Sequence, residues 1–269
     1  MNAKISKEEI EKNYNWKLSD EELIEKYFYK KDALWNEFIW KEGFESQNFS
    51  LEEKENLINE FKSYEILKSK NEFWLIDLTL KAKEKFKKEQ FIDEVFIIEP
   101  YTFFSIWKTK FWYDMHKAKW DSDIKVIKNF AKIIYEIYLK LNEKYRFDAI
   151  WFIPPTLKWR KIQIMNFIKD YFLIQNDNLK ILDIIKIDWT PSQKSLRKFD
   201  ERRENAKNSF MIGNRNKEFW NILLIDDAIW SGTTLNYVAE KIKKQNKVEK
   251  IVWLAIVGSM RWFDVIREI

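Results

Sequence analysis

The 269-residue chain contains no cysteine, a single histidine, four prolines and only four glycines. Without cysteine there are no disulfides, thiolate zinc sites or cysteine nucleophiles. The lone histidine, His116, excludes metal cages built from several histidines and argues against a Ser-His triad, so we interpret it as structural or exposed. Any catalysis must therefore use carboxylates, amines, hydroxyls and backbone groups.

Long hydrophobic runs are also missing, because no stretch reaches 18 apolar residues. Residues 1–14 carry charges where a signal peptide needs an apolar core. We therefore expect a cytoplasmic protein without a membrane partner. The 48 basic and 43 acidic residues leave a formal net charge of +5. Since this charge is spread along the chain, it is weak evidence for nucleic acid, and that partner stays open.

The shortage of glycine coincides with an excess of tryptophan. Average usage of about 7% predicts about 19 glycines in a chain of this length. The chain has four glycines and fourteen tryptophans, which together approach that number. Some bacteria read UGA as glycine, whereas other codes read it as tryptophan. The composition therefore predicts that many tryptophans stand where the native protein has glycine. The alternative is an AT-biased composition rich in Lys, Ile, Asn and Phe.

Residues 1–90 are expected to form a charged, mostly helical N-terminal extension. Capping boxes at Ser19 and Ser50 indicate two helix starts. Residues 71–88 are typical of a strand, a turn and a helix. The extension is thus either a winged-helix-like module or a plain helical appendage.

Residues 91–269 have a different sequence pattern, in which apolar runs of strand length alternate with amphipathic helices. The runs are 95–100, 148–155, 181–187, 221–226 and 250–258. Continuous apolar strands indicate a sheet buried on both faces. We therefore predict an α/β domain with a parallel, doubly wound sheet of about five strands. Ligands of such sheets bind beyond the carboxyl ends of the strands.

The run 221–226 leads into the most informative motif. Asp226 and Asp227 are followed by Ser231, Gly232, Thr233 and Thr234, and then by an amphipathic helix. Backbone N–H groups, hydroxyls and the helix dipole at such a turn can hold a phosphate, and the carboxylates can bind sugar hydroxyls or the waters of Mg²⁺. The combination predicts a site for a phosphorylated sugar. Either half alone would be read as a strand cap or a helix N-cap. Neither a Walker P-loop nor a G-x-G-x-x-G fingerprint occurs.

The segment LLIDDAIWSGTTL, residues 223–235, resembles the phosphoribosyl pyrophosphate (PRPP) motif of type I phosphoribosyltransferases. Three further segments are similar to segments of the ComF-like branch of that family. They are residues 186–210, residues 115–123 and, less closely, the loop after the second strand. The resemblance covers about residues 105–269. The family commonly begins with a cysteine-rich zinc segment, and no zinc role is carried over to this cysteine-free chain.

The resemblance implies a role for each segment. Asp226 and Asp227 would bind the ribose hydroxyls and the Mg²⁺ that arrives with PRPP. The 5′-phosphate would bind the loop made of Ala228, Ile229, Trp230, Ser231, Gly232, Thr233 and Thr234. Pyrophosphate would face the loop that contains Pro154, Pro155, Thr156, Lys158, Arg160 and Lys161. The basic segment 186–207, with Gln193, Lys194 and Arg202, would close over the phosphates, unless it is a solvated surface stretch.

The function implied is transfer of phosphoribosyl to, or from, an unidentified nitrogenous acceptor. A non-catalytic PRPP or nucleotide sensor that binds DNA through the N-terminal region is the alternative. A role in DNA uptake rests on fold analogy alone. The sequence leaves a homodimer open.

The matched segments also bear on the tryptophans. Trp230 falls in the phosphate loop, and Trp120 falls where the family has glycine. Trp151, Trp159, Trp189 and Trp262 are expected at strand ends or in loops, where glycine is common. We therefore expect Trp230→Gly to bind PRPP more tightly, and UGG codons at Trp120 and Trp230 would contradict recoding.

Overall fold

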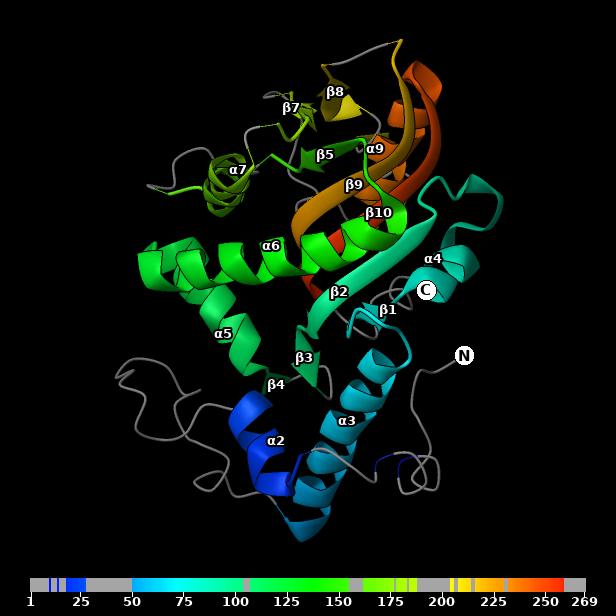
Figure 1. Cartoon of the computed structure of the whole chain (residues 1–269). Helices are drawn as coiled ribbons and strands as arrows, with labels where there is room; N and C mark the ends of the chain where they lie inside the picture. The colour runs from blue at the N-terminus through cyan, green and yellow to red at the C-terminus, as the bar shows by residue number, and fades with distance from the viewer. Residues whose placement is uncertain are drawn as a thin grey trace.

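A six-stranded sheet with the order β1-β2-β10-β9-β5-β6 forms the centre of the protein in a computed structural model (Figure 1). The structure describes residues 10, 14, 18–27, 50–103, 107–154, 162–176, 178–182, 184–187, 204–205, 208–213, 216–229 and 232–258. Five strands run parallel: β2 (Glu94–Pro100), β10 (Lys247–Gly258), β9 (Glu218–Ile229), β5 (Ala149–Phe152) and β6 (Ile181–Leu182). The predicted parallel α/β sheet is confirmed, and the two-residue β1 (Ile76–Asp77) adds an antiparallel edge beside β2.

Both faces of this sheet are buried, which explains why its strands read as unbroken apolar runs. Along β9, Ile222 and Leu224 belong to one core, whereas Leu223 and Ile225 belong to the other. The first core is shared with α9 (Thr233–Gln245), α4 (Thr79–Phe86) and α3 (Leu51–Ser69). The second is covered by α5 (Lys110–His116), α6 (Ile124–Tyr145) and α7 (Ile164–Gln175). The helices thus lie on both faces, as expected for a doubly wound sheet.

The N-terminal helices α2 (Asp20–Tyr27) and α3 begin at the two predicted capping boxes. Ser50 N donates to Glu53 Oε2 over 2.8 Å, and Glu53 N donates to Ser50 Oγ over 3.2 Å. Ser19 and Glu22 exchange the equivalent bonds at α2. The predicted strand and helix in residues 71–88 are β1 and α4. Because β1 pairs with β2, residues on both sides of position 90 contribute to one sheet.

Short elements complete the described chain. The 3₁₀-helix η2 (Lys87–Glu89) follows α4, and a single π-helical turn, η3 (Lys117–Asp121), joins α5 to α6. Two small antiparallel ladders stand outside the main sheet. One pairs β3 (Thr102–Phe103) with β4 (Trp107–Lys108), and the other pairs β7 (Ile184–Lys186) with β8 (Phe210–Ile212).

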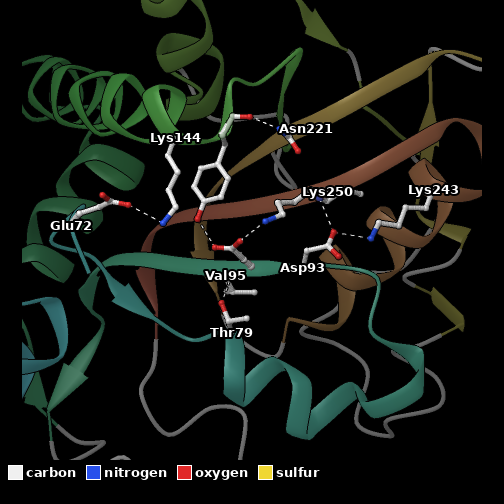
Figure 2. Close-up of polar contacts among 11 residues, drawn as sticks. Glu72, Thr79, Asp93, Val95, Lys144, Asn221, Lys243 and Lys250 are labelled. Carbon is white, nitrogen blue, oxygen red and sulfur yellow. Dashed lines mark hydrogen bonds and ion pairs between the residues drawn. The ribbon is translucent and has the colours of Figure 1, made fainter. Parts of the chain in front are cut away.

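At the amino end of the sheet, polar contacts tie the strands to the surrounding helices (Figure 2). Glu94, the first residue of β2, accepts hydrogen bonds from the Tyr145 hydroxyl of α6 and from Lys250 Nζ of β10, the latter over 2.9 Å. Asp93 accepts from Lys243 Nζ and from the backbone N of Ile251, each over 2.7 Å. Each of these carboxylates therefore has two donors.

The described tryptophans occupy contrasting environments. Trp74 has φ = 60°, in the left-handed region that a bulky residue rarely adopts and glycine adopts freely. Trp120 and Trp220 expose 53% and 66% of their surface. Trp151 and Trp253 are buried in the core, and their indole N–H groups have no hydrogen-bond partner among the described residues. The glycine interpretation is therefore best supported at Trp74.

Trp151 lies next to the end of β5, as expected, but it is fully buried in the core, where a genuine tryptophan is also favoured. This residue is inside β5, and its register partner on β9 is Leu224. The helices that cover the sheet make this strand end part of the core. Trp159, Trp189, Trp230 and Trp262 lie outside the described residues.

Candidate functional site

The two aspartates lie near the carboxyl end of β9, but the strand does not stop at them as predicted. It continues to Ile229, because the ladder with β10 continues through the pairs Asp226↔Ala255, Ala228↔Val257 and Ile229↔Gly258. The acids therefore sit within a paired strand rather than after it. This pairing holds their backbone rigidly.

The position of β9 in the sheet is that of a topological switch point. β9 lies between β10 and β5, and β5 also pairs with β6. From β5 the chain goes through α7 to β6, and from β9 it goes through α9 to β10 on the other side. Neighbouring strands whose connections leave in opposite directions open a crevice at their carboxyl ends, where doubly wound sheets bind ligands. Asp226 and Asp227 lie at that edge.

The carboxyl group of Asp226 is in an unfavourable environment for a negative charge. Its Oδ1 accepts a hydrogen bond from the backbone N of Asp227 over 2.7 Å. Burial, followed by the charge of Asp227, raises the pKa of Asp226 to about 8, although backbone donors and Lys119 partly oppose the shift. The charged form of Asp226 is therefore disfavoured, and a cation at this site would stabilise it. Such a perturbation in a ligand crevice is typical of functional carboxylates.

Lys119 is the residue of this site that was not singled out from the sequence. Its Nζ lies 2.6 Å from Asp227 Oδ2, and the two side chains are 18% and 27% exposed. Lys119 belongs to η3, and π-helical turns occur frequently at functional sites. It falls within the matched segment 115–123, but that match gave no reason to place it against β9. Only the packing of α5 and α6 over this face of the sheet brings the two together.

The phosphate-loop residues that the structure describes surround the start of α9. Gly232 is buried, has φ = 69° and immediately precedes Thr233, the first residue of the helix. The left-handed φ explains the glycine at this position. Ile229 is buried in the first core, and Ala228 is partly buried against the second core. These two can therefore offer a ligand their backbone rather than their side chains. Thr234 is the second residue of α9, whereas Trp230 and Ser231 lie outside the described residues.

The other two predicted loops are described only at one edge. Ile153 N donates to Ile225 O over 2.9 Å, so Pro154 leaves the sheet directly beside Asp226. Pro155, Thr156, Lys158, Arg160 and Lys161 lie outside the described residues, as do Gln193, Lys194 and Arg202. The structure thus places the root of the predicted pyrophosphate loop at the crevice.

At the carboxyl end of β2, a buried cluster of charged side chains connects the N-terminal helices to the sheet. Lys68 of α3 donates to Glu99 Oε1 of β2, and their side chains are 2% and 13% exposed. Lys68 also donates to the hydroxyl of Tyr27 over 3.3 Å, and that hydroxyl donates to Glu65. Burial lowers the pKa of Lys68, which the neighbouring carboxylates oppose. The second oxygen of Glu99 is buried without a partner among the described residues.

The pairing of the strands places Glu99 near the two aspartates. Glu99 pairs with Val257, and Val257 pairs with Ala228. Two strand spacings, about 10 Å, therefore separate Glu99 from β9 just beyond the aspartates. Helices α2 and α3 lie beside this end of β2 (Figure 1).

The two aspartates suit Mg²⁺ only as part of a complex with a ligand. Among the described residues, no group of three or more His, Cys, Asp or Glu could hold a metal ion. Mg²⁺ commonly uses one or two carboxylates, several waters and substrate phosphates, and it prefers the hard oxygen donors that Asp226 and Asp227 provide. The donor set therefore fits an ion that arrives with a phosphorylated substrate.

Comparison with known proteins gives no further assignment: no protein-family model matches the chain, and no curated protein matches it. Within the described part of the chain, no helix has both the length and the apolar character needed to cross a membrane.

Proposed function

We propose that this protein is a type I phosphoribosyltransferase-like enzyme that binds PRPP with Mg²⁺ and transfers phosphoribosyl to, or from, a nitrogenous acceptor. The observation that carries the proposal is the position of the Asp226-Asp227 pair. It lies at the switch point of a parallel sheet, and the strand that bears it leads within a few residues to Gly232 at the start of α9. This arrangement brings sugar-binding carboxylates and a phosphate-binding helix start to one crevice.

In this proposal the protein aligns the sugar and neutralises charge. Asp226 and Asp227 accept hydrogen bonds from the ribose hydroxyls, and backbone N–H groups at Gly232 and Thr233 donate to the 5′-phosphate. Asp226 and Asp227 would hold the Mg²⁺ that arrives with the substrate, and that ion would neutralise charge on the leaving pyrophosphate. A transition state with oxocarbenium character then needs alignment and exclusion of water more than covalent help.

A non-catalytic PRPP sensor is the second candidate, and the Lys68-Glu99 contact favours it. This buried pair connects α3 to the strand end that lies two strands from the aspartates. A ligand at the crevice would thereby influence the N-terminal helices without any turnover. DNA remains the proposed partner of that region.

Calorimetry with PRPP and Mg²⁺, followed by a pyrophosphate-release assay over a panel of nitrogenous acceptors, tests both candidates. We expect the chain, or its Trp230→Gly variant, to bind PRPP. The double variant Asp226→Asn/Asp227→Asn should bind at least about tenfold more weakly, the effect of losing charge-assisted hydrogen bonds. The matched control is Asp170→Asn, an exposed carboxylate on α7.

The outcomes separate the candidates. Binding with turnover supports the enzyme, and binding without turnover for every acceptor supports the sensor. Failure of both Trp230→Gly and the chain as written to bind PRPP would reject both.

A further inference from the structure

The ion pair between Lys119 and Asp227 is placed where the proposed site needs a divalent cation. Lys119 Nζ lies 2.6 Å from Asp227 Oδ2. An ammonium at this distance occupies a lone-pair direction of the carboxylate and the space in which Mg²⁺ or its water shell would sit. A second cation at the same oxygen would be repelled by the ammonium. The contact with Lys119 and metal binding at that oxygen therefore compete.

The neighbouring groups make this competition strong. Among the described residues, Lys119 is the cation with a salt bridge to this aspartate pair. Both partners are largely shielded from water, so their attraction is screened less than that of a surface pair. A metal ion that approaches Asp227 Oδ2 must therefore displace the Lys119 ammonium or bind beside it.

The origin of Lys119 explains how it can be released. It projects from η3, which ends at Asp121 and is followed by its C-cap Ser122, with φ = 56°, and by the N-cap Asp123 of α6. The lysine has four rotatable side-chain bonds and reaches β9 from a separate element, so rotation of the side chain frees Asp227 without moving the sheet. A freed lysine is also a point-charge donor for phosphate oxygens.

We propose that Lys119 is a positioning residue that occupies the cation position at Asp227 in the ligand-free protein and yields it when a metal-bound ligand arrives. The proposal rests on the proposed function for the identity of that ligand. Its consequence is that the protein binds a free divalent cation poorly and selects the cation together with its phosphate ligand. Lys119 then moves from the carboxylate to the phosphate groups.

Two measurements with opposite expected signs test this proposal. The first is binding of Mn²⁺ alone, an ion that accepts the same oxygen ligands, followed by electron paramagnetic resonance. We expect Lys119→Met to bind Mn²⁺ at least about fivefold more tightly than the unsubstituted chain, a modest coupling between two sites. The second is calorimetry with Mg²⁺-pyrophosphate, for which we expect Lys119→Met to bind about tenfold more weakly.

Matched variants separate competition from a merely structural role. Lys125→Met removes an exposed lysine from the first turn of α6 and should leave both affinities unchanged. Lys119→Arg retains the charge and should keep Mn²⁺ binding weak. If Lys119 merely stabilised the shape of the site, Lys119→Met would weaken Mn²⁺ binding as well, and that result would overturn the proposal. An unchanged Mn²⁺ affinity would also overturn it.

Failure of the proposed function gives a different result. If Lys119→Met tightens Mn²⁺ binding while neither protein binds PRPP or pyrophosphate, the competition at Asp227 is supported. Phosphoribosyl transfer is then the part that fails.

Discussion

The two ends of the central sheet treat their carboxylates in opposite ways. At the amino end, burial disfavours the charge of Glu94, but hydrogen bonds from Tyr145 and Lys250 outweigh it and lower the pKa of Glu94 (Figure 2). At the carboxyl end, burial and a second carboxylate raise the pKa of Asp226 to about 8. Burial raises the pKa at both ends, so the difference comes from the neighbouring groups, which are side-chain donors at Glu94 and a second carboxylate at Asp226. The amino end is built for stability, whereas the carboxyl end places two carboxyl groups side by side, whose charges a bound cation can neutralise.

The largest effect on stability is expected at Lys68. This residue forms a buried ion pair near the carboxyl end of β2. Replacing Lys68 by Met leaves the buried Glu99 without its cation, and breaking such a pair costs about 3 to 5 kcal/mol. Urea unfolding of the purified protein measures this loss. The control is Lys62→Met on the same helix, whose pair with Asp20 is more exposed and is worth less than about 1 kcal/mol. Equal losses for the two variants would contradict the buried role of Lys68.

Glu94→Gln tests the amino end. The variant loses a charged acceptor for Tyr145 and Lys250 and should be about 1.5 to 3 kcal/mol less stable at pH 7. Because the pKa of Glu94 is lowered in the folded protein, its contribution is present above the ordinary value of 4.5 and is lost as pH falls through the lowered pKa. The deficit of the variant should therefore shrink on acidification. Unfolding curves from pH 7 to pH 3 measure it, and a constant deficit would show that charge is not its cause.

Asp226→Asn should change the stability of the protein in the opposite direction to Glu94→Gln, and its effect should depend on pH in the opposite way. The pKa of Asp226 is raised from 3.8 to about 8, so the folded protein holds its proton more tightly than the unfolded chain does. The stability linked to this group is present below pH 3.8 and is lost as pH rises through about 8. In metal-free buffer, the variant should gain about 1 to 2 kcal/mol at high pH, a typical stability–function exchange. Thermal unfolding at pH 5 and pH 8.5 measures it, and a variant that is less stable at pH 8.5 would remove the contrast between the two ends.

The smallest effect on stability is expected at Trp74. This position tests the glycine interpretation and does not depend on the comparison between the two ends of the sheet. A non-glycine residue in the left-handed region costs about 1 to 2 kcal/mol, and Trp74 has φ = 60°. Trp74→Gly should therefore be about 1 kcal/mol more stable than Trp74→Ala, since the two variants lose the same indole and differ at φ. Denaturant midpoints of the two variants provide the comparison. Equal midpoints would leave the codon sequence as the remaining evidence for recoding.

Local patterns in the sequence predicted the elements well. The five apolar runs correspond to β2, β5, β6 with β7, β9 and β10, because strands buried on both faces leave a continuous hydrophobic signal. The Ser50 and Ser19 boxes marked helix starts, because a cap involves residues only three positions apart. Gly232 was recognisable for the same local reason.

Contacts between distant segments were not predictable. The ladder with β10 extends β9 past Asp226 to Ile229, and a one-dimensional pattern contains no information about that partner. Lys119 was one of many lysines until α5 and α6 packed over the sheet and brought it to Asp227. Trp151 was placed near a strand end from the sequence, but its burial beside Leu224 depends on β9 and the covering helices.

By itself, the sequence determined the alternation of buried strands and amphipathic helices, the helix caps and the order of acids, glycine and helix at residues 226–245. These are set by interactions over a few residues and by hydrophobic periodicity. The tertiary structure alone decided that β9 lies at the switch point, that burial disfavours the charge of Asp226 and that Lys119 neutralises Asp227. Each of these depends on burial and on charges from separate elements, which exist only once the helices have packed onto the sheet.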